Sequence, residues 1–347
     1  MLFYCAGESS WRTHEFVFAA DIEKMYRQIV IHLEDRNFQR ILWSPDGPPL
    51  EFQLCTVTYG LTCAPYLALR VIQQLASDEE QTFPQAAAIL RKETYVDDIL
   101  SGADSPQEAQ RKASQLRNLL TAGGFRLQKW TSNEDSILSN ISMTSEHSSS
   151  RPLPTEARTL GLDWHPANDV FKLHVSSSNS SLPLTKRNAL SRVAQLFDPL
   201  GWLAPVTIVG KIFIQRLWKS QIGWDDPLPS DLANEWSIFN DGLIGVSELS
   251  IPRCIGTSST TQGIEFHGFS DASQDALGAV LYIRTFHHYA DAKVVLLTAK
   301  SKVAPVKPSL GWSSQPPCYL LVFRLGFEPC SIITTSLHTC GQIQASR

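Results

Sequence analysis

Residues 93–101 read Glu-Thr-Tyr-Val-Asp-Asp-Ile-Leu-Ser, and this stretch decides how the surrounding chain can fold. Two adjacent acids, Asp97 and Asp98, stand between short apolar segments, a pattern that predicts a β-hairpin with the acids beside its turn. Successive side chains of a strand point to opposite faces, so a tight hairpin can present one or both carboxylates to a shared cleft. Such pairs are common, and a solvated turn is the favoured explanation when the pair stands alone.

A third carboxylate follows another apolar, strand-like run. Asp21 comes directly after Phe-Val-Phe-Ala-Ala at residues 16–20. A carboxylate at the end of an apolar strand is costly unless it is paired or bound to a metal ion. Phosphoryl transfer by two divalent ions needs carboxylates that place the metals roughly 3.5–4 Å apart. Asp21, Asp97 and Asp98 supply such a set from two predicted strands.

Two helices are predicted on either side of the hairpin. Residues 65–76 have helical spacing of apolar residues, with a proline in the first turn. Residues 104–120 carry the stronger signal, because Ser105 as N-cap and Glu108 three residues later form a capping box. Two glycines then end this helix.

Composition indicates a globular chain with a locally basic segment. The chain has 347 residues, of which 43% are hydrophobic and 18% charged, enough for two or three domains. The net charge of -4 argues mildly against a dedicated nucleic-acid coat. Residues 183–223, however, contain a single acid, Asp198, and six basic residues that could follow phosphates: Lys186, Arg187, Arg192, Lys211, Arg216 and Lys219.

Cysteine spacing and hydropathy exclude several other classes. The seven cysteines form no C-x-x-C pair and no zinc-type spacing, so we expect intracellular thiols. No apolar run is long enough for a membrane span, and the N-terminus shows no secretory signal. Three Ser/Thr/Asn-rich stretches predict linkers or long loops: residues 131–158, 176–181 and 256–263.

Four segments together resemble the palm motifs of reverse transcriptases, in their usual order. They are ADIEKMYRQI at 20–29, YGLTCAP at 59–65, YVDD at 95–98 and GFRLQKW at 124–130. The amino-acid sequence of these segments is most similar to Pol proteins of BEL/Pao-type LTR retrotransposons, and the resemblance extends from about residue 10 to residue 307. The resemblance implies an α+β fold with a right-hand polymerase palm, then a thumb/connection segment and a truncated ribonuclease H-like α/β domain.

The resemblance also implies a role for each matching residue in an RNA-directed DNA polymerase. Asp21, Asp97 and Asp98 would bind two Mg²⁺ ions, or Mn²⁺, with Asp98 the weaker ligand. Lys129 would protonate pyrophosphate, and Tyr26 would exclude a 2′-hydroxyl beneath the incoming dNTP. A surface lysine and a core tyrosine are the simpler interpretations. The rest of the nucleotide and template pocket would be formed by Tyr59, Gly60, Pro65 and Tyr95.

Residues 160–164 and 190–205 resemble the next Pol stretch, which has been labelled a Pao-type aspartic peptidase region. Peptidase chemistry needs an Asp in a D-[ST]-G turn, and neither Asp163-Trp164 nor Asp198-Pro199 provides one. A thumb or connection element that binds the backbone of an RNA/DNA template-primer duplex is the better interpretation. Its backbone contacts would be Lys186, Arg187, Lys211 and Arg216, unless these form a solvated basic helix face.

Residues 266–284 (FHGFSDASQDALGAVLYIR) resemble the opening hairpin of a ribonuclease H-like fold, with Asp271 as a metal ligand. Beyond Pro308, codons read one nucleotide earlier in frame can spell Pro-Arg-Leu-Glu-Leu, as the family would continue. Trp312 has a single codon and constrains this reading. We therefore interpret 309–347 as frameshifted, and we expect an inactive ribonuclease H site without its helix glutamate or later Asp.

We expect a palm with truncated fingers at 1–130, followed by a Ser-rich linker at 131–159 and a thumb/connection at 160–250. A partial ribonuclease H domain at 264–307 and a tail at 309–347 complete the chain. The expected function is that of a reverse transcriptase fragment. Because only twenty residues precede Asp21, an inactive nucleic-acid-binding remnant is the first alternative, and a Pao-type peptidase is the second. The family implies a cytoplasmic, virus-like-particle context without a membrane partner. The oligomeric state stays open.

Overall fold

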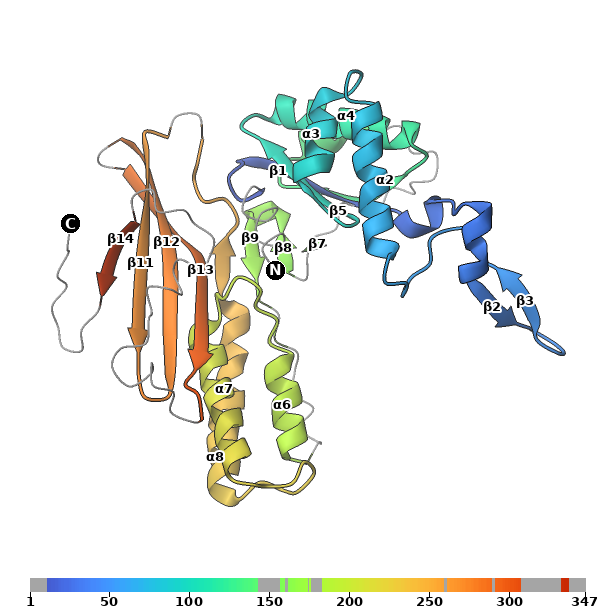
Figure 1. Ribbon diagram of the computed structural model, residues 1–347. Coiled ribbons are helices and arrows are strands. Elements are labelled where there is room, and N and C mark those ends of the chain that lie inside the picture. Colours follow the sequence, from blue (N-terminus) through green and yellow to red (C-terminus); the bar gives the residue numbers. More distant parts are fainter. Residues whose placement is uncertain are drawn as a thin grey trace. The chain divides into compact units, whose positions relative to one another are not determined.

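A computed structural model of the chain describes residues 11–142, 157–159, 162–173, 175, 183–258, 261–288, 291–306 and 332–336. The chain divides into two compact units (Figure 1). Unit 1 comprises residues 1–160 and 166–168, and unit 2 comprises residues 161–165 and 169–347. Both units combine helices with largely antiparallel sheets, so the predicted α+β class is confirmed.

Unit 1 is built on a four-stranded antiparallel sheet of order β4-β5-β1-β6. Its strands are β1 (Phe16–Ile22), β4 (Thr94–Tyr95), β5 (Asp98–Ala103) and β6 (Leu127–Ser132). Its helices are α2 (Ala64–Asp78), α3 (Pro84–Lys92), α4 (Pro106–Ala122) and α5 (Asp135–Ser142). The remaining elements are η1 (Met25–Gln28), η2 (Leu33–Phe38), β2 (Arg40–Trp43), β3 (Leu50–Gln53), β7 (Ala157–Thr159) and η3 (Pro166–Asn168).

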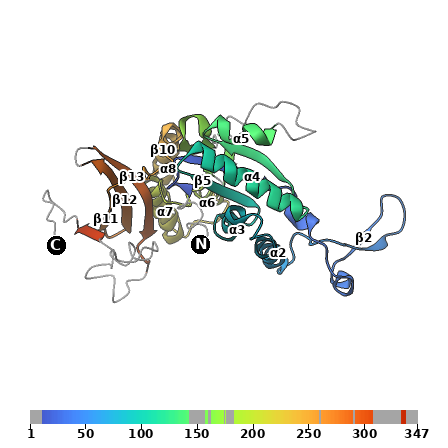
Figure 2. The ribbon, with the colours of Figure 1, turned by 90° about the horizontal axis from the view of Figure 1, so that it is seen from above.

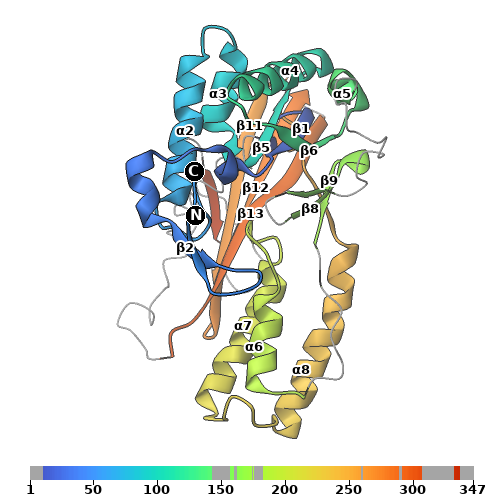
Figure 3. The same cartoon turned by 90° about the vertical axis from the view of Figure 1, so that its right-hand side faces the viewer.

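Helices cover one face of this sheet, as Figures 2 and 3 show for α4 above β1 and β5. Phe18 on β1 and Ile99 on β5 belong to the same buried cluster as Leu116 and Leu120 of α4. Each such side chain contributes roughly 1.5–3 kcal/mol by leaving water. Because side chains alternate along a strand, residues of the other parity, including Asp21, point to the face away from this cluster.

Both helices predicted beside the hairpin are present as α2 and α4. Ser105 caps α4 as expected, since its Oγ accepts a hydrogen bond of 3.3 Å from the backbone N–H of Glu108. The expected linker at 131–159 is wrong in its first part. Strand β6 continues to Ser132 and α5 follows, because Ile137, Leu138 and Ile141 bury an apolar face in the unit 1 core. Residues 143–156 lie outside the described residues.

Unit 2 contains a second four-stranded sheet, of order β13-β12-β11-β14. The three long antiparallel strands are β11 (Gly263–Ala272), β12 (Ala276–His288) and β13 (Asp291–Val303). The short strand β14 (Ile332–Ser336) pairs in parallel with β11. Helices α6, α7 and α8 run side by side (Figures 1 and 3) at Lys186–Ala194, Ala204–Lys219 and Ser230–Gly242. The other elements are β8 (Leu162–His165), β9 (Val170–Lys172), η4 (Leu243–Glu248) and β10 (Ser250–Pro252).

The helices of unit 2 pack against its large sheet. The Trp202 indole donates to the Leu297 carbonyl at 3.2 Å, and Gln215 of α7 donates to the Ala304 carbonyl at 2.5 Å. Unit 2 therefore joins the segments that we expected as a separate thumb/connection at 160–250 and ribonuclease H domain at 264–307. That expected separation is wrong, because the start of α7 buries its apolar side chains on β12 and β13.

Candidate active site

Asp97 and Asp98 lie at a two-residue hairpin between β4 and β5. Tyr95 pairs with Asp98, which leaves Val96 and Asp97 as the turn. Val96 has a φ of 56°, a left-handed conformation that is strained for a β-branched residue. Such strain persists where the surrounding structure enforces it and is concentrated at functional sites. The predicted hairpin is confirmed, and its turn places the two acids in succession.

Asp21 and Asp98 are direct neighbours across the unit 1 sheet. They form a register pair between β1 and β5, and the Ile22 N–H donates to the Asp97 carbonyl at 2.8 Å. Side chains of directly opposite residues have Cβ atoms roughly 4.5–5.5 Å apart, where like charges are destabilising. Both carboxylates lie on the face away from the helical core. The structure therefore brings together the first strand's acid and the hairpin's acids.

The protonation of the hairpin acids reflects this proximity. The pKa of Asp98 is raised to about 6, mainly by burial and then by the charges of Asp97 and Asp21, whereas the charge of Lys129 acts to lower it. Burial also raises the pKa of Asp97, with an added contribution from Asp21. The site is a concentration of negative charge in a partly desolvated setting.

Two residues of β6 contact Asp21. Gln128 donates to Asp21 Oδ1 at 2.8 Å, and Lys129 Nζ lies 3.1 Å from Oδ2. The β1–β6 register shifts between Ala19 and Asp21, and Lys129 has a φ of 54°. This bulge redirects the chain, so that two consecutive side chains reach the same carboxylate. Sequence reasoning found Lys129 but missed Gln128, because the register that pairs it with Asp21 leaves no local signal.

Tyr26 and Tyr59 lie beside the acids. Their rings meet edge to face, with centroids 5.1 Å apart, and burial and then the charge of Asp97 raise the pKa of Tyr26. Tyr59 is 61% exposed, whereas Tyr26 is half-buried and packs against the unit 1 core. Gly60 adopts a φ of 87°, beyond the reach of most residues.

Pro65 and Tyr95 complete the predicted pocket residues. Pro65 is in the first turn of α2 and exposed, and Tyr95 is 38% exposed at the end of β4.

Oxygen ligands of this kind suit Mg²⁺. Within the residues that the structure describes, no three Asp, Glu, His or Cys side chains are grouped closely enough to hold a metal ion. Gln128 and Lys129 each donate to one oxygen of Asp21, and each oxygen keeps a second lone pair that could bind a metal ion.

The four basic residues predicted to contact a nucleic-acid backbone do not form one free stripe. Lys186 is buried, because its Nζ lies over the ring of Trp218 of α7, 4.0 Å from the centroid, and over the ring of Trp224, 5.5 Å from the centroid. Arg187 pairs with Asp225 at 2.7 Å, and Arg216 pairs with Glu235 at 2.5 Å. The expectation is therefore wrong for Lys186, whereas Lys211 is exposed on α7.

Asp271 lies where the sequence predicted it, on the first strand of a hairpin. It is exposed on β11 opposite Gly278, and its Oδ1 accepts from the Ala272 N–H at 2.8 Å. It borders a mostly apolar cavity of about 440 Å³ between the start of α7 and the sheet. The described part of the chain supplies Asp271 with no group of metal-binding side chains.

The two acids considered for a peptidase have structural positions. Asp198 Oδ2 accepts from the Leu203 N–H at 2.9 Å, so it stabilises the turn before α7, and burial raises its pKa. Asp163 lies on β8 opposite Lys172. Neither contact is the shared-proton pairing that an aspartic protease requires.

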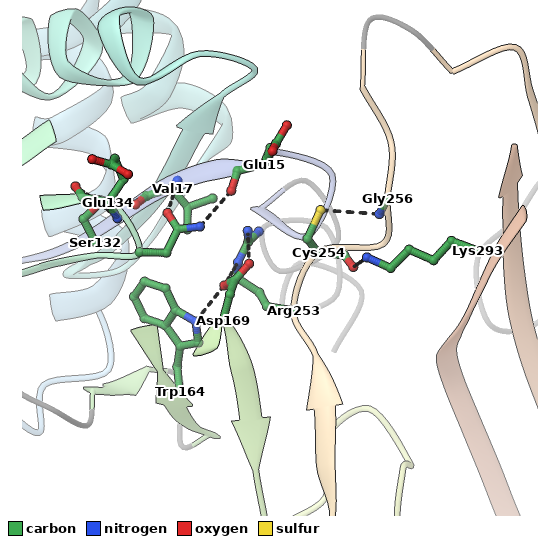
Figure 4. Close-up of polar contacts among 11 residues, drawn as sticks. Glu15, Val17, Ser132, Glu134, Trp164, Asp169, Arg253, Cys254, Gly256 and Lys293 are labelled. Atoms are coloured by element: carbon green, nitrogen blue, oxygen red, sulfur yellow. Dashed lines mark hydrogen bonds and ion pairs between the residues drawn. The ribbon is translucent and has the colours of Figure 1, made fainter. Parts of the chain in front are cut away.

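A buried ion pair stabilises the small sheet that β8, β9 and β10 form in unit 2 (Figure 4). The Arg253 side chain is fully buried and donates to both oxygens of Asp169, at 2.6 and 2.7 Å. The Trp164 indole donates to the same carboxylate at 3.1 Å. Asp169 has a φ of 49°. No sequence motif had indicated this network.

Residues 185–338 match the family described as Pao retrotransposon-like RNaseH-like domain. The match supports a Pao-type retrotransposon protein, and an RNaseH-like domain suggests a nucleic-acid-processing enzyme that binds nucleic acid. The matched range begins in the helical segment that we expected as thumb/connection, and it extends into residues 309–338 of the tail. The frameshift in that tail stays a prediction. No curated protein matches the chain. Among the described helices, none is long and apolar enough to cross a membrane.

Proposed function

Since residues 185–338 match a Pao retrotransposon-like RNaseH-like domain, we propose that the chain is a reverse-transcriptase part of a Pao-type Pol protein. Unit 1 is its polymerase palm, and Asp21, Asp97 and Asp98 form the nucleotidyl-transfer site. The observation that supports this most is the register pair between Asp21 and Asp98 on the sheet face away from the helical core. Like charges opposite each other destabilise a sheet, and a bound cation would remove this repulsion.

The three carboxylates would hold two Mg²⁺ ions, with Mn²⁺ as a substitute. Bound ions would activate the primer 3′-hydroxyl and stabilise the pyrophosphate leaving group. The donor chemistry fits, because burial and then the charge of neighbouring acids raise the pKa of Asp97 and Asp98, and a divalent cation would offset both costs of ionising them. In the chain alone, the Lys129 ammonium partly offsets this charge.

The chain's other site residues would position the reactants. The primer oxygen bonds to the α-phosphorus of a dNTP as the bond to pyrophosphate breaks. Tyr26, braced edge to face by Tyr59, would lie against the sugar and exclude a 2′-hydroxyl. Lys129, 70% exposed, can leave Asp21 and donate its proton to pyrophosphate. Gln128 would keep Asp21 oriented during this exchange.

Primer extension tests the proposal. Full-length Pol enzyme containing Asp97→Asn should lose Mg²⁺-dependent extension of a primer on an RNA template by at least about 10³-fold, since one metal ligand is removed. Asp46→Asn makes the same charge change at an exposed residue of the β2–β3 turn and should leave extension unchanged. Extension that survives Asp97→Asn would refute the site.

An inactive nucleic-acid-binding remnant is the second candidate. It is favoured by the two contacts that occupy Asp21 and by the lack of a grouped metal site among the described residues. Fluorescence anisotropy with a labelled template-primer separates the two functions. Binding without extension, in both the parent chain and Asp97→Asn, would establish the remnant.

A further inference from the structure

Unit 2 contains a cavity that the proposed polymerase site does not use. Its volume is about 440 Å³, and it lies between the start of α7 and the strands β11, β12 and β13. Small-molecule sites have roughly 300–1,000 Å³ and apolar walls on which a few polar groups converge. The walls here are mostly apolar, and Asp271 contributes a carboxylate. The cavity therefore has the size and the lining of a binding site.

Aromatic rings from two parts of unit 2 line this cavity. Trp202, shortly before α7, is held in place because its indole N–H donates to the Leu297 carbonyl at 3.2 Å. The rings of Phe269 on β11 and Tyr282 on β12 meet edge to face, with centroids 6.1 Å apart. Aromatic rings prefer offset-stacked and edge-to-face contacts with other rings. These walls therefore suit a flat aromatic ligand.

Gly278 keeps space open beside Asp271. The two residues form a register pair between β11 and β12, and a Cβ added to Gly278 would meet nothing within 4 Å. Asp271 Oδ1 accepts from the Ala272 N–H at 2.8 Å, whereas Oδ2 has no hydrogen-bond partner among the residues that the structure describes. A carboxylate oxygen accepts hydrogen bonds from N–H groups. The open space therefore suits an aromatic ring that carries N–H donors.

A second cavity adjoins the first and offers a cation. It has a volume of about 310 Å³ and shares Phe269 and Tyr282 with the first, and its lining includes His267 and Arg284. Glu265 offsets part of the charge, since it accepts from Arg284 at 2.9 Å and contacts His267 at 3.2 Å. A guanidinium has five N–H donors, however, so others can reach an anion. Arginine binds phosphate groups in this way.

The two cavities follow one another along a single face of the sheet. Phe269 and Asp271 alternate along β11, and they share a face with Gly278, Tyr282 and Arg284 of β12. Gly278 and Arg284 are six positions apart, which is about 20 Å along a strand. A single nucleic-acid strand covers this length with roughly six stacked nucleotides, and with fewer when it is extended.

We propose that these two cavities bind a single-stranded nucleic acid through an unpaired base. The base enters the larger cavity, packs on its aromatic walls and donates an N–H group to Asp271, while Arg284 contacts a phosphate of the same strand. Aromatic side chains beside positive charge are the usual means of holding single strands. The match to a retrotransposon RNaseH-like domain agrees with a nucleic-acid ligand. The proposal does not rest on the polymerase site of unit 1.

Fluorescence anisotropy of the full chain, at low salt and with a chelator present, tests the proposal. A labelled single strand of about twelve nucleotides is the probe. It should bind with a Kd on the order of 1–100 μM. A blunt-ended duplex of the same length has no unpaired base and should bind at least about tenfold more weakly.

Variants of the larger cavity locate the bound base. Gly278→Leu fills the open space and should weaken binding of the single strand at least about tenfold. Gly245→Leu is the matched control, because a Cβ at this glycine of η4 also meets nothing within 4 Å and lies outside both cavities. Tyr282→Leu removes one ring and should weaken binding at least about fivefold.

Variants of charge test the phosphate contact. Arg284→Gln should reduce the slope of log K against log salt concentration by about 0.7, the value for one phosphate contact with a single strand. Lys302→Gln removes the same charge from an exposed residue of β13 outside both cavities and should keep the slope of the parent. An unchanged slope in Arg284→Gln would show that the phosphate contact is absent.

Far-UV circular dichroism must show that each variant keeps the parent fold. No binding at about 100 μM chain, or equal affinity for single strand and duplex, overturns the proposal. So does parent-like binding by folded Gly278→Leu and Tyr282→Leu, or equal weakening by Gly245→Leu. Because these variants lie in unit 2, the result is separate from the primer-extension test of unit 1.

Discussion

Asp21 on β1 and Asp98 on β5 lie directly opposite each other on the face of the unit 1 sheet away from the helical core. Burial and then the charges of Asp97 and Asp21 raise the pKa of Asp98. Gln128 and Lys129, brought to the same point by the β6 bulge, occupy the oxygens of Asp21. The acids therefore lie in a partly buried, charged cluster and not in a solvated turn, and this arrangement has measurable consequences.

The first prediction concerns stability against pH. Because the folded chain raises the pKa of Asp98 to about 6, it binds this proton more tightly than the unfolded chain does. The free energy of unfolding therefore falls as pH rises from about 4 to about 6. Without divalent ions, Asp98→Asn should remove this loss and be more stable than the parent at pH 7, by roughly 1–2 kcal/mol after allowing for solvent screening.

Thermal unfolding by circular dichroism from pH 4 to pH 8, with a chelator present, measures this effect. Asp46→Asn, a matched change at an exposed site, should keep the parent's pH slope. An unchanged slope in Asp98→Asn would contradict the prediction.

The second prediction concerns Lys129 as the counter-charge of the site. Its ammonium lowers the pKa of both Asp97 and Asp98. Lys129→Met should therefore raise both pKa values, which carboxyl-carbon NMR titration reports directly. Lys219→Met removes an exposed lysine of unit 2 and should leave both titrations in place. Identical titration curves in Lys129→Met and the parent would show that the contact does not persist in solution.

The third prediction compares two Arg–Asp pairs of similar geometry. Arg253 is fully buried against Asp169, so Arg253→Met leaves a buried charge and should cost about 3–5 kcal/mol. Arg187 contacts Asp225 at the surface, and Arg187→Met should cost far less. Urea unfolding gives both values. Similar losses in the two variants would mean that burial does not determine the importance of the Arg253 pair.

The fourth prediction tests the packing of the α7 start on β13. Gly201 has a φ of 76°, and a Cβ there would lie 1.6 Å from the Ala299 carbonyl oxygen. Gly201→Ala should destabilise unit 2 by more than ~2 kcal/mol, because neither backbone can yield without losing the contact. Gly278→Ala, whose added Cβ meets nothing within 4 Å, is the control. Equal melting temperatures for the two variants would contradict the packing described.

Local signals predicted the local structure well. Ser105 and Glu108 predicted the start of α4, and the apolar runs around Asp97 and Asp98 predicted a hairpin. The expected linker failed at α5, because a short amphipathic segment within a Ser/Asn-rich stretch is stabilised by the core that it meets. Lys186 failed for a similar reason, since its burial between Trp218 and Trp224 comes from packing.

The sequence by itself determined the β-hairpin, the two flanking helices and the identity of the three candidate carboxylates, whereas the α+β class was implied by the family resemblance. Those features follow from residue periodicity, capping and turn chemistry, which act over a few neighbouring residues. The tertiary structure alone decided that Asp21 faces Asp98, that Gln128 joins Lys129 at Asp21, and that the unit 2 helices pack on its sheet. Strand register and packing depend on contacts between residues far apart in the chain, and no local pattern encodes them.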